Sequence, residues 1–453
     1  MRYVLPPAKA ADPPGADGVH AIARKPSPLA RLPFYYGWVI VAATFVCMAL
    51  GVNARTAFSL FFPPILQEFG WESSTTAGTF SVGFLGAAAL SPWLGWLMDR
   101  HGPRAVTLLG TAAMVGGLLL ATLVSEPWQL YATLGLLVGG GSICLGYSGF
   151  SLFLPNWFQR RRGFATSIAF SGVGLGSILL LPWLQGVIES QGWRAACWAL
   201  GVLVALLVTP LTLLLRKRPE DLGLQPDGAA ASGESEAPGH AAIADPVWAA
   251  TEWTLPLAMR TRRFWWVALG YFWALYVWYA VQVHQTYYLI EVGFDPTQAA
   301  WALGLVSLIA IPGQIGLGHL SDRIGREWVW SMACLGFVLS YLLLLAMRHW
   351  PGEALLYAMI GCQGALGYGM TSVMAAIAAE IFQGRNYGRI LGALMLAMIA
   401  GGAVGPWLSG LLRDASGSYD LAFVVAIVGC GISAGAIWLA GPRHIRPVGR
   451  FVL

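Results

Sequence analysis

Two basic side chains interrupt long apolar stretches of this sequence, and each could bind an anion. Arg55 follows Trp38 by 17 residues, and His284 follows Trp266 by 18. Because a helix rises about 1.5 Å per residue, both would lie at nearly the same depth in a membrane-spanning helix. A charge there normally faces a water-filled cavity, where a guanidinium can hold a carboxylate through two parallel hydrogen bonds. We predict that both residues bind an anionic ligand, and His284 could instead carry a coupled proton.

A structural role is the alternative for both residues. The long side chain of Arg55 could extend to the outer lipid headgroups, and His284 could pack near the outer interface. Tyr147 and Tyr368 each follow a Leu-Gly pair in an apolar stretch, and a ring with one hydroxyl suits either a cavity wall or the core. Weaker candidates for the same binding site are the uncharged polar residues Asn53, Gln285, Gln314 and Gln363.

The composition places these residues in a membrane. Of 453 residues, 57% are hydrophobic and only 11% are charged, whereas a soluble domain is about 25% charged. The apolar residues form continuous runs rather than alternating, which favours helices over a β-barrel. The scattered net charge of +5 offers no phosphate-tracking face, so nucleic acid is excluded as a partner. The expected partner surface is the lipid bilayer.

The apolar runs predict an all-α membrane protein with twelve transmembrane helices, since about 20 apolar residues cross the hydrocarbon core. We place the spans at about 36–62, 74–97, 105–124, 128–154, 162–188, 193–215, 264–290, 297–319, 328–347, 351–382, 387–412 and 419–440. Residues 1–35 and 441–453 are predicted tails, the first of them flexible. Residues 216–263 are a predicted linker, with a short amphipathic helix at about 248–259.

The basic residues set the orientation. Lys and Arg total 27, and all but Arg55, Arg194, Arg348 and Arg413 lie in tails, linker and hairpins that would share one face. Lys and Arg are retained on the cytoplasmic side. Both tails and the linker are therefore predicted to be cytoplasmic, in a multi-pass protein of the cell (inner or plasma) membrane.

An internal repeat predicts two pseudo-symmetric six-helix halves, residues 36–215 and 264–440. The Gly-x-Leu-x-Asp-Arg-x-Gly motif that contains Asp99 recurs around Asp322, 223 residues later. A Pro-Trp-Leu motif at residue 182 recurs at residue 406, and the Leu-Gly-Tyr that ends at Tyr147 recurs at Tyr368. Parallel halves of this kind are typical of alternating-access transporters, with a site at the midplane between them.

The Asp99 motif is similar to the loop 2–3 signature of the major facilitator superfamily. Residues 36–39, 59–63, 156–163 and 417–420 further resemble its monocarboxylate porter and oxalate–formate antiporter group. The resemblance covers about 36–439 and implies the major facilitator fold and secondary active transport. It also implies that Asp99 docks on a helix N-terminus as a conformational latch. The other latch residues that it implies are Arg100, Arg104, Asp322 and Arg323.

Turn chemistry and ordinary orientation-setting arginines are the alternative for these hairpins. The sequence departs from the porter group in one respect, because 299–318 contains no charge and the middle of 387–412 contains none. A dicarboxylate would favour two cations, so one carboxylate is the better prediction. Glu380, close in sequence to Arg385 and Arg389, is expected to form a salt bridge at an interface; a proton site is the alternative.

We expect a secondary active transporter of a small organic anion, a monocarboxylate, coupled to protons and functional as a monomer. Exchange, dicarboxylate antiport and efflux of a hydrophobic compound are alternative transport functions. A transporter-like ligand sensor is an alternative of another class. The six cysteines lie far apart and no metal cluster, Walker motif or catalytic constellation is present. We therefore expect no enzyme activity, no cofactor, no metal site and no catalytic residue.

Overall fold

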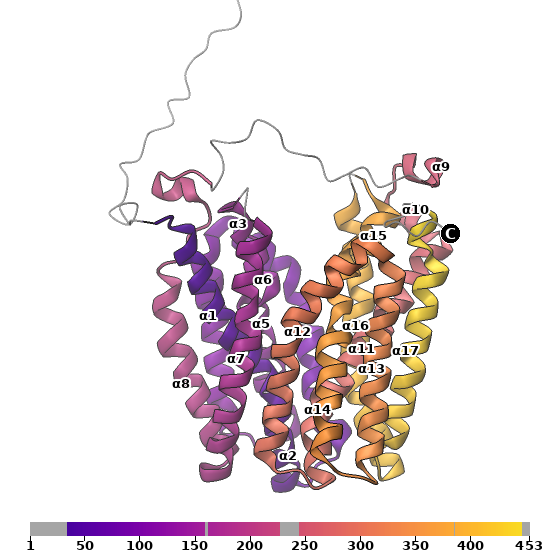
Figure 1. Ribbon diagram of the computed structural model, residues 1–453. Coiled ribbons are helices and arrows are strands. Elements are labelled where there is room, and N and C mark those ends of the chain that lie inside the picture. Colours follow the sequence, from indigo (N-terminus) through magenta and orange to yellow (C-terminus); the bar gives the residue numbers. More distant parts are fainter. Residues whose placement is uncertain (1–33, 159–161, 227–243, 385, 446–453) are drawn as a thin grey trace, which may run out of the picture.

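The computed structural model describes residues 34–158, 162–226, 244–384 and 386–445. Most of the predicted N-terminal tail, residues 227–243 of the linker, Arg160, Arg161, Arg385 and the last eight residues lie outside these ranges. Within them the secondary structure is helical and contains no strand. The described chain begins and ends on the same side of the molecule (Figure 1). We call this side the terminus face and the other side the opposite face.

Each half supplies six spans, as the apolar runs predict. The first half contains α1 (Gly37–Thr56), α2 (Phe58–Phe69), α3 (Ser73–Ala121), α4 (Pro127–Leu130), η2 (Tyr131–Val138), α5 (Gly139–Cys144), α6 (Tyr147–Ser151), η3 (Leu154–Asn156), α7 (Arg162–Gln191) and α8 (Trp193–Thr212). The second contains α11 (Arg262–Glu291), α12 (Pro296–Ile324), α13 (Arg326–Met347), α14 (Glu353–Gly361), η6 (Cys362–Leu366), η7 (Gly367–Gly369), α15 (Met370–Phe382), α16 (Tyr387–Ser416), α17 (Asp420–Ala440) and η8 (Pro442–His444).

The helix α3 forms two spans. Its 49 residues would extend for about 74 Å at 1.5 Å per residue, more than twice the thickness of a hydrocarbon core. Gly102 divides it with φ 75°, and Gly325 has φ 101° at the same point of the second half. Only glycine adopts such angles freely. Eleven described segments are long and apolar enough to cross a membrane, and one of them is Trp93–Ala121 of α3. The beginning of α3, where a span is predicted at about 74–97, is the twelfth. The predicted fold is confirmed.

Glycines bring the first and fifth spans of each half close together. A Cβ on Gly172 or Gly176 of α7 would clash with the backbone of α1 at Phe45 and Ala49. A Cβ on Gly401 or Gly405 of α16 would clash in the same way with α11 at positions 272 and 276. The two contacts are counterparts, and they set the rotation of α1 and α11 within their halves.

The two halves contact each other along α7 with α12 and along α3 with α16. Gly174 of α7 has no room for a Cβ beside Ser307 of α12, and Gly304 of α12 has little beside Ser177 of α7. On the other side, the hydroxyl of Ser81 donates to the carbonyl of residue 403 in α16. In Figure 1 the indigo-to-magenta half and the orange-to-yellow half form two bundles side by side.

The end of the linker packs on the terminus face of the second half. It forms α9 (Pro246–Ala250) and α10 (Leu255–Met259), so the expected single helix is two short ones, whereas η4 (Pro219–Leu222) lies at the start of the linker, just after α8. The indole of Trp248 donates to the carbonyl of Ile381 at 2.8 Å. Trp253 packs edge-on against Phe382, 5.4 Å between ring centroids. This segment therefore covers the end of α15.

Candidate functional site

A cavity of about 1230 Å³ lies between the two halves. Residues of α1, α3, α5, α6, α7, α11, α12, η7 and α16 form its walls. Towards the terminus face it is lined by the exposed residues Ser91, Ile315 and Leu396. Much of the wall is aromatic, contributed by Phe80, Phe84, Tyr147, Phe170, Trp278, Tyr279 and Tyr368. Such walls suit a ligand with an apolar body.

Beyond the cavity, towards the opposite face, the two halves are in contact. The hydroxyl of Ser59 in α2 lies 2.9 Å from that of Thr286 and 3.1 Å from the carbonyl of Val283, both in α11. The ring of Phe62 packs edge-on against His284 at 5.1 Å. These contacts close the opposite face, so the cavity is accessible from the terminus face.

Arg55 is the one charged side chain among the described residues that line this cavity. Its guanidinium carbon lies 3.9 Å from the ring centroid of Phe84, 4.6 Å from that of Phe80 and 5.5 Å from that of Tyr279. Its Nη2 is buried and has no hydrogen-bond partner in the described part of the chain. Three rings thus hold a cation whose hydrogen-bonding capacity is unused.

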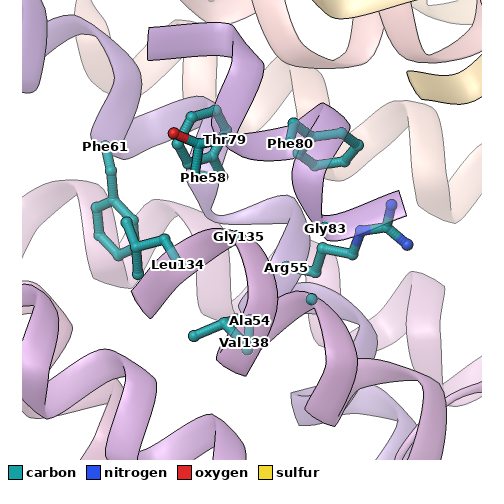
Figure 2. Close-up of a pocket in the computed structure, with 11 residues that line it drawn as sticks. Ala54, Arg55, Phe58, Phe61, Thr79, Phe80, Gly83, Leu134, Gly135 and Val138 are labelled. Carbon is teal, nitrogen blue, oxygen red and sulfur yellow. The ribbon is translucent and has the colours of Figure 1, made fainter. Parts of the chain in front are cut away.

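Figure 2 shows how Arg55 reaches its position. Its guanidinium points away from Phe58, Phe61 and Thr79, which lie around a small void behind its stem. That void measures about 10 Å³, at the lower limit for one water molecule. The charged end of Arg55 therefore projects towards the main cavity, where an anionic ligand could contact it.

The two tyrosines from the repeated Leu-Gly-Tyr motif both line the cavity. Tyr147 is 47% exposed and packs edge-on against Phe170 at 5.1 Å. Tyr368 is almost fully buried, and its ring centroid lies 3.8 Å from that of Trp278. Both rings thus line the cavity, and Tyr147 is the more exposed of the two.

The uncharged polar candidates divide into two groups. Gln314 and Asn53 line the cavity, but the amide of Asn53 is occupied: its Nδ2 donates to the carbonyls of residues 49 and 173, and its Oδ1 accepts from Ser177. Asn53 therefore joins α1 to α7. Gln285 and Gln363 are fully buried outside the lining, with amide atoms that have no hydrogen-bond partner among the described residues.

His284 lies in a different setting from Arg55. It is fully buried, is not part of the cavity lining, and makes a hydrogen bond with each ring nitrogen. Its Nε2 lies 2.8 Å from the carbonyl oxygen of Pro406, and its Nδ1 lies 2.8 Å from the hydroxyl of Tyr419. A carbonyl only accepts, so Nε2 donates, and a neutral ring then accepts the tyrosine proton at Nδ1. His284 joins α11 to α16 and α17 and cannot contact a ligand in this conformation.

Two sets of cavity residues were not among the predicted binding residues: Gln282, and the aromatic rings that surround Arg55. Gln282 lines the cavity from α11, and its Oε1 is buried without a hydrogen-bond partner in the described residues. Because 12% of the chain is aromatic, no composition signal marks Phe80, Phe84 or Tyr279. Gln282 could have been predicted, because it is a polar residue in the same apolar run, about one helical turn before Gln285.

The hairpin after the second span contacts its own half and the start of the linker. Asp99 pairs with Lys217 at 3.0 Å, and Arg104 donates to the carbonyls of residues 213 and 215 at the end of α8. Arg100 lies over the ring of Trp96 at 5.4 Å. None of these contacts joins the two halves. In this conformation these contacts of Asp99, Arg100 and Arg104 are therefore not with the second half.

The corresponding hairpin of the second half forms an ion-pair network. Asp322 pairs with Arg326 at 2.7 Å, and Arg326 also pairs with Glu380 at 2.8 Å. Arg323 is exposed. Glu380 therefore forms an ion pair, but with Arg326 of its own half and not across an interface. This network, too, lies within one half.

Comparison with protein families and with known proteins agrees with this geometry. Residues 41–290 and 267–451 match the model of the Major Facilitator Superfamily. The chain is 28% identical to monocarboxylate transporter 13 of Rattus norvegicus over 412 residues, covering 90% of this chain and 87% of that protein. It is 27% identical to monocarboxylate transporter 11 of Mus musculus over 423 residues, covering 90% and 88%.

Solved structures show the same fold. A bacterial homologue of the human lysosomal transporter Spinster, in an inward-facing and occupied conformation, superposes with a TM-score of 0.69 at 16% identity, covering 90% of this chain and 97% of that one. A point mutant of the nucleoside transporter NupG superposes with a TM-score of 0.66 at 13% identity, covering 90% and 100%.

Proposed function

The chain belongs to the major facilitator superfamily, and we propose that it carries a small organic anion with a single carboxylate by alternating access of its central cavity. As a member of this superfamily it is a multi-pass membrane transporter rather than an enzyme. The observation that carries the proposal is the isolated Arg55, the one charge in the described cavity lining, with an unused hydrogen-bonding nitrogen.

A buried, unpaired charge costs several kcal/mol, so an anionic partner has a strong reason to bind. A carboxylate placed beside Arg55 would accept hydrogen bonds from its guanidinium, and such charge-assisted bonds are stronger than neutral ones. Phe80 and Phe84 lie beside the guanidinium but offer it no hydrogen-bond acceptor, so Nη2 is left for the ligand. The apolar body of the ligand would then lie against Tyr147 and Trp278.

One cation in the lining favours one carboxylate. A dicarboxylate would leave its second charge against an aromatic wall, at the cost of losing its water. The relatives named as monocarboxylate transporters support the same substrate class. Exchange and dicarboxylate antiport are therefore secondary to monocarboxylate transport in our proposal.

We propose proton symport, with His284 as the titrating group. A proton on Nδ1 would convert it from acceptor to donor, and the hydroxyl of Tyr419 would have to turn. The ring of Tyr419 also lies 5.2 Å from the guanidinium of Arg413, so this change would reach the contacts that close the opposite face. We further propose that the terminus face is cytoplasmic in the plasma membrane and that Asp99, Arg100, Arg104, Asp322 and Arg323 latch it when it closes. The monomer contains the whole cavity.

Binding and uptake measurements test the proposal. Purified protein is titrated with a panel of mono- and dicarboxylates while its thermal unfolding is followed, because a ligand of the folded state raises the melting temperature. Proteoliposomes with an imposed pH gradient then report uptake of radiolabelled ligand. We expect monocarboxylates to bind, and Arg55→Ala to abolish both signals. Arg389→Ala, which removes an exposed arginine of α16, is the matched control and should retain both.

The proposal fails if Arg55→Ala and the wild-type protein bind carboxylates equally. Uptake that does not respond to the pH gradient contradicts proton symport but not carboxylate binding. If His284→Gln responds to pH as the wild-type protein does, His284 is not the titrating group. Hydrophobic efflux is the second candidate, since the cavity of about 1230 Å³ is largely aromatic. Stabilisation by hydrophobic cations but by no carboxylate would favour it. Binding without flux would favour a ligand sensor.

A further inference from the structure

The two halves begin their second spans at the opposite face in different ways. At the start of α12, the carboxylate of Asp295 accepts from the backbone N–H groups of Thr297 at 2.8 Å and Gln298 at 3.4 Å. This is an ordinary cap made by a neighbour in the sequence. Glu72 holds the corresponding place before α3, 223 residues earlier, and its side chain makes no cap hydrogen bond.

The cap of α3 comes instead from the other half of the molecule. Asp414, near the end of α16, accepts from the backbone N–H of Ser73 at 3.0 Å and from that of Ser74 at 2.7 Å, one bond to each carboxylate oxygen. These N–H groups have no partner within their own helix, and the helix N-terminus carries a partial positive charge. The carboxylate thus meets both hydrogen-bond donors and a favourable dipole.

The surrounding contacts keep Asp414 on this helix end. Gly410, one turn earlier in α16, has no room for a Cβ beside the backbone of residues 73 and 74. Arg413 donates to the hydroxyl of Ser73 at 3.1 Å, to that of Tyr287 at 3.0 Å and to Glu291 at 3.3 Å. Arg413 therefore links the α3 cap to the end of α11.

The counterpart crossing, α7 with α12, has a weaker contact. There the hydroxyl of Thr297 donates to Glu189 at 3.1 Å in an exposed position, and α12 already has its own cap. The closed state of the opposite face therefore depends on α3 and α16 more than on α7 and α12.

We propose that the cap supplied to α3 by Asp414 is the switch of the opposite face, made when that face closes and broken when it opens. Asp414 is a positioning residue that acts on the halves and does not touch the ligand. The proposal rests on the proposed function in one respect, because it takes the two halves to rock about the central cavity. Opening would leave the first turn of α3 without a side-chain cap, and this cost would favour the closed face.

Hydrogen–deuterium exchange of the full chain in nanodiscs tests the switch without labels. In Asp414→Ala, amides of the first turn of α3 should exchange about tenfold faster, the factor expected for a lost cap. If the cap is a switch, peptides from α2 and from the end of α11 should also exchange faster, because the contacts of Ser59 with Thr286 open together with it. Asp414→Asn keeps one acceptor oxygen and should show a smaller increase at the same peptides.

Asp295→Ala is the matched control. It also removes a carboxylate cap, but one that lies in the same half as the helix it caps, α12. It should raise exchange in the first turn of α12 alone. The switch is overturned if Asp414→Ala changes only the first turn of α3, or if it changes nothing. Carboxylate binding by wild type separates the two proposals: coupled exchange without binding supports the switch and contradicts the proposed substrate, and binding without coupled exchange does the reverse.

Discussion

The first spans of the two halves carry a basic residue at nearly the same depth, yet the two residues have opposite surroundings. Arg55 faces the cavity with a nitrogen that has no partner among the described residues. His284 is buried between α11, α16 and α17 with both ring nitrogens hydrogen-bonded. Depth along a helix is therefore a poor guide to function unless the rotation about its axis is known as well.

The glycine contacts supply that rotation. Gly172 and Gly176 contact α1 at residues 45 and 49, whereas Gly401 and Gly405 contact α11 at residues 272 and 276. The partner positions differ by 227 in both cases, and the same offset relates Arg55 to Gln282. Gln282 does line the cavity, while His284 lies two residues further, about 200° around the helix. The counterpart of the cation is thus a neutral amide.

Replacing Arg55 with Gln would make the first half like the second and should have the largest effect. Two charge-assisted hydrogen bonds are lost, so affinity for a monocarboxylate should fall about 100-fold or more. Calorimetric or thermal-shift titration measures the change. An affinity within a few-fold of wild type would show that the carboxylate binds elsewhere and would remove the basis of the comparison.

Replacing Gln282 with Arg would instead make the second half like the first. A second cation across the cavity should improve binding of a dicarboxylate about tenfold relative to a monocarboxylate, roughly one added charge-assisted hydrogen bond. Competition between paired mono- and dicarboxylates of equal length measures the ratio. If the ratio does not change, positions 55 and 282 do not face the same ligand.

Phe84→Leu tests how the rings hold Arg55. The guanidinium carbon lies 3.9 Å from the centroid of this ring, and a cation–π contact contributes about 0.5–2 kcal/mol. Carboxylate affinity should fall about threefold because the cation is less well positioned. Phe337→Leu, in a buried ring of α13 that does not line the cavity, is the control. Equal losses in both variants would indicate a general packing defect.

His284→Gln should change carboxylate affinity least, by less than about twofold, because the side chain does not reach the cavity. It should still lower stability by about 1–3 kcal/mol, since the buried hydroxyl of Tyr419 or carbonyl of Pro406 loses its partner. Thermal unfolding without ligand measures the stability, and titration measures the affinity. A large loss of affinity with unchanged stability would indicate that His284 binds the ligand after all.

The fold followed from the sequence because its signals are long and redundant. Twelve apolar runs, the repeated hairpin around Asp99 and Asp322, and the excess of arginine on one side all agree on two six-helix halves. The two spans predicted at about 74–97 and 105–124 are the two parts of α3, and Gly102, with its non-helical φ of 75°, divides them.

The site was predictable only in part. Arg55 is recognisable from its charge alone, since a membrane span tolerates few charges. The partners of Asn53 and His284 are not, because they lie on other helices and depend on rotations of about 100° per residue. Tyr147 and Tyr368 share a motif, but only the structure distinguishes the exposed ring from the buried one.

The cap that Asp414 provides also has a consequence for biosynthesis. Ser74 and Asp414 are 340 residues apart, and a ribosome adds about 5–20 residues each second. The first turn of α3 therefore waits roughly 20–70 s for its cap while the rest of the chain is made. A nascent chain that stops before α16 would leave this helix end without its cap, so completion of the first turn of α3 depends on the arrival of α16.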